Sequence, residues 1–164
     1  MKEIDLALES YKPIRDSLKE HFGNRLKCVV LFGSQARGEA RPESDHDLFV
    51  VIDDLPRDPL RRNRAVRMTL LPVLDRLPGP ISFVSKTPGE VAANLTPLLL
   101  DVFVDGICIH GQSYFEPRHR RAMDAVQQAG LLRKRVAGTW TWRFPQLQTG
   151  NWEISWEGYR ESSR

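Results

Sequence analysis

The chain has 164 residues, of which 41% are hydrophobic and 27% are charged, and its formal net charge is +3. These fractions exclude an intrinsically disordered or collagen-like protein, and the length is that of one domain with a small appendage. The longest apolar runs, such as residues 28–32, are too short to cross a membrane. The N-terminal segment carries Glu3 and Asp5 and lacks an apolar signal core, so we expect a cytoplasmic protein without membrane attachment.

The charge is distributed unevenly along the chain. Residues 1–110 contain 15 Lys and Arg against 16 Asp and Glu, whereas residues 111–164 contain 9 against 5. A basic C-terminal third is compatible with binding to nucleic acid or to an acidic partner, and equally with an ordinary solvated surface. Cys28 and Cys108 lie in apolar runs without C-x-x-C spacing, which predicts buried thiols and no structural zinc site.

The first predicted elements are a helix and two strands. Apolar residues at three- and four-residue steps predict an amphipathic helix over 4–22, with a kink or a restart at Pro13. The continuous apolar run 27–32 predicts a strand that is covered on both faces. A second strand is predicted over 47–52, after a polar and turn-prone stretch.

A second helix is predicted over 58–77, with a bend at Pro72. Its apolar side chains are expected to face inward: Leu60, Val66, Leu70, Leu71, Val73 and Leu74. Its other face carries four arginines: Arg61, Arg62, Arg64 and Arg67. We expect that face either to be solvated or to meet a triphosphate, a nucleic acid or an acidic partner.

A strand over 81–84 follows, and then a helix that Thr87 caps. Short helices are expected as far as residue 104, and a last small strand over 107–109. The order of elements predicts an α/β (α+β) fold, with a small mixed sheet covered by helices. We assign residues 1–112 to this domain and residues 113–164 to a C-terminal extension that packs on it.

The predicted extension consists of a helix and a tryptophan-rich hairpin. Pro117 is expected to open the helix, which ends at Gly130. Period-two alternation in residues 139–144 and 152–156 predicts two strands, joined by 145–150 into one β-hairpin with an aromatic face. This face is expected to cover the α/β core or a second copy of the chain. Alternatively, it stacks on single-stranded nucleic acid beside the basic residues.

The segment LFGSQARGEARPESDHDLFV carries the chemistry. Gly33 and Ser34 end a strand, where a glycine lets a phosphate approach the backbone and a helical turn can direct N–H groups at it. Arg37 lies one turn further on and can add a charge-assisted contact. Asp45 and Asp47 project from the same face of a strand with Cα atoms roughly 7 Å apart. Mg²⁺ takes one or two such carboxylates and completes its shell with water and phosphate oxygens.

The GSQARG segment followed by SDHDL resembles the signature of the minimal nucleotidyltransferases, in the superfamily related to DNA polymerase beta. Every fixed position of G-S-x-A-R-G and S-D-x-D-L is matched: Gly33, Ser34, Ala36, Arg37, Gly38, Ser44, Asp45, Asp47 and Leu48. The resemblance implies that Gly33 and Ser34 hold the nucleotide phosphates and that Asp45 and Asp47 are catalytic residues that bind Mg²⁺. It also implies transfer of a nucleoside monophosphate from a nucleoside triphosphate to an acceptor.

The chain departs from the family at one position. By resemblance, a third carboxylate from the next strand helps to hold a second metal and to activate the attacking hydroxyl, and Ser82 stands at the position that aligns with it. A serine is a weak neutral ligand and no base at neutral pH. His46, between the two aspartates, is expected to point to the opposite face of the sheet and to be packed or at the surface.

Three functions remain open at this point. The first is a Mg²⁺-dependent nucleotidyltransferase that uses ATP and modifies a protein, a nucleic acid or a small molecule; by resemblance, the protein acceptor includes a toxin-like partner. The second is a nucleotide-binding module whose transferase activity is weak or lost because of Ser82. The third is a nucleic-acid or protein adaptor that uses the basic, tryptophan-rich tail. The first requires another carboxylate close to Asp45 and Asp47, for which Asp101 and Asp105 are the candidates.

Overall fold

A computed structural model describes residue 5, residues 8–146 and residues 150–162. The elements of the sheet domain are α2 Lys12–Phe22, β1 Leu26–Phe32, α3 Gly33–Ala36, β2 His46–Ile52, α4 Pro59–Leu70, β3 Ile81–Lys86, α5 Pro88–Ala93, α6 Pro97–Leu100 and β4 Ile107–His110. They are followed by α7 Gln112–Ala129, β5 Leu132–Val136, β6 Thr139–Arg143, β7 Asn151–Ser155 and β8 Gly158–Ser162. Within the described residues, no helix is long and apolar enough to cross a membrane.

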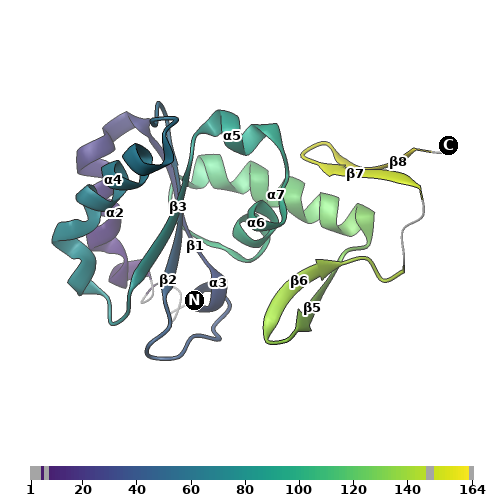
Figure 1. Ribbon diagram of the computed structural model, residues 1–164, viewed down its shortest axis with the longest axis horizontal. Coiled ribbons are helices and arrows are strands. Elements are labelled where there is room, and N and C mark those ends of the chain that lie inside the picture. The colour runs from purple at the N-terminus through teal and green to yellow at the C-terminus, as the bar shows by residue number, and fades with distance from the viewer. Residues whose placement is uncertain (1–4, 6–7, 147–149, 163–164) are drawn as a thin grey trace.

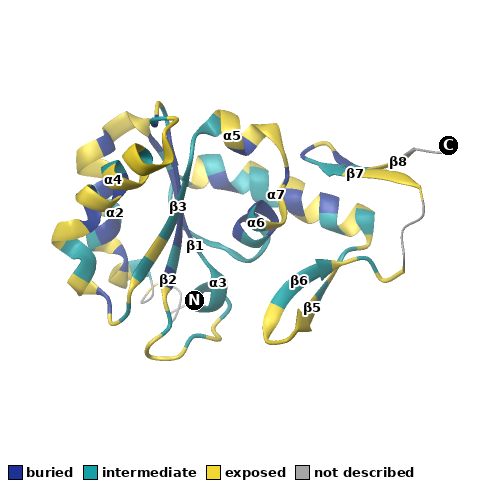
Figure 2. Ribbon diagram, in the orientation of Figure 1, coloured by how far each residue is buried: buried dark blue, intermediate teal, exposed yellow. Residues whose placement is uncertain are grey.

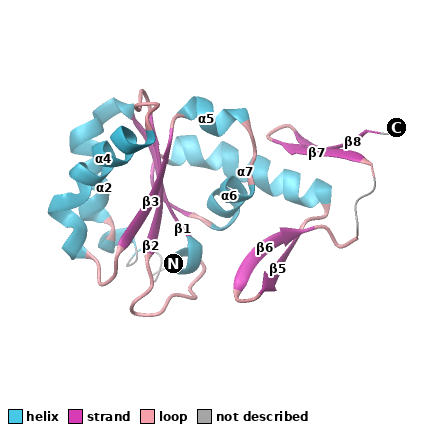
Figure 3. Cartoon of the chain, in the orientation of Figure 1, coloured by secondary structure: helices cyan, strands magenta, loops and turns pink. Residues whose placement is uncertain are grey.

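The central sheet has four strands in the order β3-β2-β1-β4. β1 runs antiparallel to both β2 and β4, whereas β2 and β3 are parallel. Figures 1 and 3 show the sheet between two groups of helices, with α2 and α4 on one side and α5, α6 and α7 on the other. This arrangement confirms the predicted α/β (α+β) fold with a mixed sheet.

Each face of the sheet has its own hydrophobic core. Along β1, Val29 and Leu31 belong to the core under α2 and α4, whereas Cys28 and Val30 belong to the core under α5, α6 and α7. Strand residues alternate between the two faces, so a strand buried on both sides must be apolar throughout. The dark blue centre of Figure 2 reflects this burial. The prediction of a buried Cys28 is confirmed, and Cys108 on the edge strand β4 is half-buried.

Both helices of the first core are interrupted close to their prolines. Residues 8–10 are helical, Tyr11 forms a turn and α2 restarts at Lys12, in agreement with the predicted restart at Pro13. The predicted helix 58–77 is α4 followed by a 3-10 segment over Leu71–Arg76 that contains Pro72.

Two of the residues that were expected to face inward from the predicted helix 58–77 lie outside the core. Leu60 is 81% exposed and Leu71 is 47% exposed. Leu60 falls in the first turn of α4, and the helix changes its geometry at Leu71, so neither side chain continues the buried stripe of Val66 and Leu70. Ile4 of the first predicted helix lies outside the described residues.

The C-terminal part differs from the prediction in two respects. α7 begins at Gln112, after Gly111 with φ +84°, so Pro117 lies inside the helix instead of opening it. The two aromatic segments do not pair with each other: β6 pairs with β5, and β7 pairs with β8. The tail therefore forms two antiparallel hairpins, where one was predicted (Figure 1).

The two hairpins contact the sheet domain through tryptophans. Trp156, which follows β7, is 8% exposed, and its Nε1 donates a 2.7 Å hydrogen bond to the carbonyl of Val91 in α5. Its ring packs edge-on against Phe103, with 5.5 Å between the ring centroids. Trp142 on β6 donates from Nε1 to Asp101. The division at residue 112 remains a prediction.

Candidate active site

The candidate site starts where β1 ends. Phe32 and Asp47 are paired across β1 and β2, so the turn after Phe32 passes beside the carboxylate of Asp47. Gly33 has φ +73°, a left-handed conformation that favours glycine. A β-carbon built on Gly33 would overlap Oδ2 of Asp47 and lie 3.3 Å from its Cγ. The glycine is therefore required both for the turn and for the close approach of the carboxylate.

The two aspartates differ in their surroundings. Asp45 is exposed and immediately precedes β2, so it does not lie on the strand as predicted, whereas Asp47 is half-buried on the strand. Burial raises the pKa of Asp47, the negative charge of Asp45 raises it further, and Arg37 opposes the shift. Asp47 is thus a carboxylate whose charge is incompletely compensated by the protein, which is a property of functional sites.

His46 lies between Asp45 and Asp47 in the sequence and belongs to the opposite side of the sheet, as predicted. Its ring is 5% exposed, and its Nδ1 lies 2.6 Å from the hydroxyl of Tyr11. Burial lowers the pKa of His46 and raises the pKa of Tyr11 to about 12, so both groups are held neutral at physiological pH. The histidine fixes the start of β2 and does not face the aspartates.

Ser82 lies directly beside Asp47 in the sheet. The parallel pairing of β2 with β3 makes Asp47 and Ser82 Cα partners, and paired residues project from the same face. Ser82 is exposed. The structure therefore places the serine at the side of Asp47 where the resemblance expects a carboxylate.

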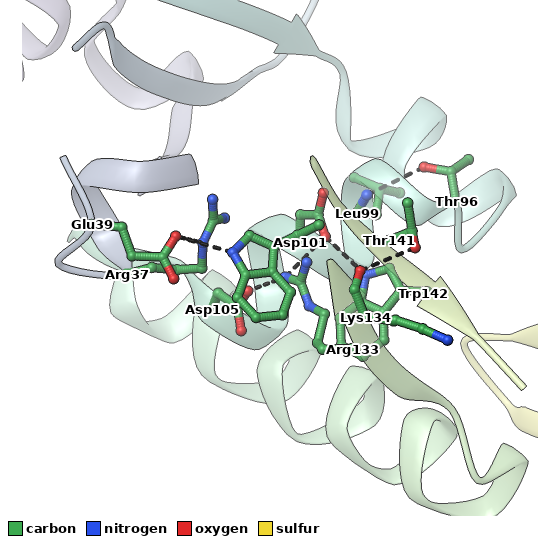
Figure 4. A network of polar contacts seen from close by, with 11 residues as sticks. Arg37, Glu39, Thr96, Leu99, Asp101, Asp105, Arg133, Lys134, Thr141 and Trp142 are labelled. Carbon is green, nitrogen blue, oxygen red and sulfur yellow. Dashed lines mark hydrogen bonds and ion pairs between the residues drawn. The ribbon is translucent and has the colours of Figure 1, made fainter. Parts of the chain in front are cut away.

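The two candidate replacements for the third carboxylate, Asp101 and Asp105, both pair with Arg133, and Asp101 lines the same pocket as Gly33 and Ser34. Arg133 on β5 lies 3.0 Å from Asp101 through its Nη2 and forms a second ion pair with Asp105. Trp142 donates a 2.8 Å hydrogen bond to the same oxygen of Asp101. Figure 4 shows Arg133 between the two aspartates. Burial raises the pKa of Asp105, and the charge of Arg133 opposes this shift.

Arg37 is held on the rim of the site by an acidic neighbour. Its Nε lies 3.2 Å from Oε2 of Glu39, and the same oxygen accepts a 3.0 Å hydrogen bond from Nε1 of Trp140 on β6. The hydrogen bond from Trp140, followed by that from Arg37, lowers the pKa of Glu39. The contact from β6 was not predicted, because nothing in the sequence relates a tail residue to the GSQARG turn.

A pocket of about 330 Å³ lies at this turn. One side is formed by residues of the predicted phosphate site, Gly33, Ser34 and Arg37, and the other by residues of the β5–β6 hairpin. The hairpin residues are Arg135, Gly138, Thr139 and Trp140. Sequence reasoning found the first side and missed the second. The alternation of Trp140 with Trp142 indicates a strand, but the prediction paired this strand with residues 152–156 and not with residues 132–136.

Two carboxylates beside the turn would hold a magnesium ion, and the charge of Asp45 acts on Asp47. Asp45 and Asp47 supply two carboxylates, and Mg²⁺ is commonly held by one or two carboxylates together with substrate phosphates and water. Among the described residues, no group of three or more His, Cys, Asp or Glu could hold a metal ion. A bound metal would therefore depend on oxygens from the nucleotide as well as on the two aspartates.

Comparison with known proteins places the chain in a family. The sequence profile of the nucleotidyltransferase domain matches residues 12–77. A curated relative from Methanocaldococcus jannaschii, named as a candidate protein adenylyltransferase, is 31% identical over 98 residues, or 59% of this chain and 67% of the relative. The chain belongs to the nucleotidyltransferase family. A second candidate protein adenylyltransferase from that organism is 40% identical over 45 residues, or 27% of this chain and 45% of the relative.

Solved structures agree with this assignment at the level of the fold. A toxin–antitoxin complex crystallised with AMP-PNP contains a chain with a TM-score of 0.51 and 23% identity, covering 70% of this nucleotidyltransferase and 84% of that chain. The spectinomycin adenyltransferase AAD(9) from Enterococcus faecialis, solved with ATP and spectinomycin, has a TM-score of 0.51 and 16% identity. The match covers 72% of this chain and 64% of that chain. The predicted family and the prediction of a transferase are confirmed.

Proposed function

We propose that this nucleotidyltransferase moves an adenylyl group from ATP to a hydroxyl group of a protein, with the reaction centred on Asp45 and Asp47. The observation that carries the proposal is the approach of Asp47 to Gly33, which joins the predicted metal ligand to the predicted phosphate turn. The motif around these residues is matched in full, and the family transfers nucleoside monophosphates.

The reaction exchanges one phosphorus–oxygen bond for another. The acceptor oxygen attacks the α-phosphorus of ATP, and the bond from that phosphorus to the bridging oxygen of the β-phosphate breaks. Pyrophosphate leaves with the electron pair of the broken bond, and the acceptor hydroxyl loses its proton. Because Ser82 cannot accept that proton at neutral pH, we assign it to solvent, which makes transfer slow relative to a site with a third carboxylate.

The chain's own residues bind and orient the nucleotide. Gly33 and Ser34 offer backbone N–H groups to the phosphates, and the Arg37 guanidinium adds a charged contact. Asp45 and Asp47 would hold Mg²⁺, which neutralises phosphate charge and stabilises the attacking and leaving oxygens when bound.

A protein acceptor is favoured by the relatives. Both curated relatives are named as candidate protein adenylyltransferases, and a chain of the same fold occurs in a toxin–antitoxin complex crystallised with AMP-PNP. A toxin-like partner is therefore the acceptor to test first. The second function is a nucleotide-binding module with weak transfer, which Ser82 beside Asp47 favours.

The test is calorimetric titration of Mg–ATP into the wild type, Asp47→Asn and Asp75→Asn. Asp75 is exposed on the 3-10 segment and serves as a control of equal charge change. We expect the Asp47 variant to bind at least tenfold more weakly, about 1.4 kcal/mol, and the Asp75 variant to bind as the wild type does. Incubation with labelled ATP and candidate acceptor proteins then separates transfer from binding alone. Absence of binding to the wild type would refute the proposal.

A further inference from the structure

The β5–β6 hairpin faces the GSQARG turn across the pocket. Arg135 and Trp140 are partners across the hairpin, and both line the pocket opposite Ser34 and Arg37. The turn between the strands has positive φ at Ala137 and Gly138, 49° and 82°, as in the two-residue turns that match the twist of a hairpin. The tip of a regular hairpin thus reaches the predicted phosphate site.

Contacts further along the same hairpin hold it in this position. Arg133 and Trp142 are the next pair on that face, two residues away from Arg135 and Trp140. Arg133 forms ion pairs with Asp101 and Asp105, and its guanidinium lies 4.2 Å from the centroid of the Trp142 ring. The side chain of Arg133 is only 18% exposed, so these ion pairs are partly shielded from water. The hairpin is therefore fixed to the sheet domain beside the pocket.

The three arginines near the pocket differ in their ion pairs. Asp101 is paired with Arg133, and Glu39 is paired with Arg37. Arg135 forms a long 3.4 Å hydrogen bond with the carbonyl of Gly138, and it has no ion-pair partner within the described residues. The guanidinium of Arg135 lies 5.6 Å from the centroid of the Trp140 ring, and its charge helps to lower the pKa of Glu39. An exposed guanidinium that forms no ion pair in the described part of the chain, on the wall opposite Arg37, suits an anion with several negative oxygens.

We propose that the β5–β6 hairpin is the second wall of the nucleotide site, where Arg135 binds the phosphate chain of a nucleoside triphosphate opposite Arg37. The inference rests on the proposed function and extends it to residues outside the matched motif. In this arrangement, the phosphate chain lies between one arginine of the turn and one arginine of the hairpin.

Trp140 acts in the same wall as a positioning residue. Its indole N–H holds Glu39, and Glu39 in turn binds Nε of Arg37. A carboxylate on Nε leaves the two terminal nitrogens of the guanidinium to form paired hydrogen bonds with a phosphate. Trp140 thereby orients Arg37 through Glu39.

The first experiment compares Arg135→Ala with Lys134→Ala by titration of Mg–ATP. Lys134 is the adjacent residue on β5, is exposed, and projects from the other face of the hairpin, so the two variants lose the same charge. We expect Arg135→Ala to bind Mg–ATP about tenfold more weakly and Lys134→Ala to bind within twofold of the wild type. Thermal unfolding of both variants checks that the hairpin remains folded.

The second experiment uses tryptophan fluorescence, which reports on Trp140 without any transfer. Mg–ATP is expected to change the emission of the wild type and of Trp152→Phe, in which an exposed tryptophan of the other hairpin is replaced, but to change that of Trp140→Phe much less. If Trp140 acts through Glu39, the losses of ATP affinity in Trp140→Phe and Glu39→Gln will not add in the double variant. Additive losses would overturn the positioning role.

The outcomes separate the two proposals. If the wild type binds Mg–ATP, Asp47→Asn weakens binding and Arg135→Ala does not, the hairpin wall is refuted and the proposed function stands. If the wild type binds no Mg–ATP, both proposals fail.

Discussion

Asp47 and Ser82 are neighbours in the parallel pairing of β2 with β3, and Ser82 is exposed at that position. An aspartate in place of Ser82 would bring a third carboxylate to the same side of the sheet as Asp47, where a hydroxyl now stands. The serine therefore leaves the site without a base at this position, and a single substitution can test the effect on transfer.

We predict that Ser82→Asp increases the rate of adenylyl transfer. A positioned general base contributes about 10²–10⁴-fold to a proton-transfer step, so an increase of tenfold or more is expected. Like charges repel, so the variant should also be less stable than the wild type until Mg²⁺ is added. Ser82→Asn, of similar size and uncharged, is the control. Equal rates for the two variants would show that Ser82 is not the position from which a base can act.

The glycines of the motif offer a matched pair. Gly33 and Gly38 both have positive φ, +73° and +69°, but a β-carbon at Gly33 would overlap Asp47, whereas no atom of the described residues lies within 4 Å of one at Gly38. Gly38→Ala should lose about 1–2 kcal/mol of stability through its backbone alone. Gly33→Ala should lose more and should also bind Mg–ATP weakly, because Asp47 must move. Urea denaturation and calorimetry measure the two effects; equal losses in both variants would contradict the overlap.

His110 should contribute to the acid sensitivity of the fold. Burial lowers its pKa from 6.5, and the charges of Lys19 and Arg15 act in the same direction. Below pH 6.5 the unfolded chain takes up a proton that the folded chain does not, so stability falls as the pH drops through this window. His110→Gln should therefore lose less stability than the wild type between about pH 7.5 and about pH 5.5. Urea midpoints at both pH values measure this loss of stability. An equal loss in His110→Gln and in the wild type would argue against the prediction.

Trp156 should be the main attachment of the β7–β8 hairpin. Trp156→Phe removes the hydrogen bond to Val91 and leaves space beside Phe103, so we expect a loss of about 2–4 kcal/mol. Trp152 is 45% exposed, and Trp152→Phe should change stability by about 0.5 kcal/mol or less. Thermal and chemical unfolding distinguish the two variants. Similar losses would mean that Trp156 does not anchor the hairpin.

The parts of the fold that the sequence predicts well are those with local causes. The phosphate turn, the aspartates and the two strands around them lie within one segment of the sequence, residues 26–52, and the two strands pair antiparallel with each other. The start of α5 was also predicted, since Thr87 and Glu90 form the expected capping box. In these cases, neighbouring residues determine the structure.

The remaining features depend on partners distant in the sequence. Alternation identifies β6 and β7 as strands but does not identify their partners, and β5 was missed because its sequence, LRKRV, is basic. The ion pairs of Arg133 with Asp101 and Asp105 could not be predicted from the sequence either, because the three residues meet only after the β5–β6 hairpin folds back on the sheet domain. For the same reason, half of the pocket lining was not foreseen.

The hydrogen bond between Trp140 and Glu39 joins positions 101 residues apart in the chain. At a synthesis rate of about 5–20 residues per second, Glu39 is made roughly 5–20 s before Trp140. The four strands of the sheet are all made before the hairpin, because β4 ends at His110. The growing chain therefore passes through an interval in which the strands beside the phosphate turn have been made but the opposite wall of the pocket has not.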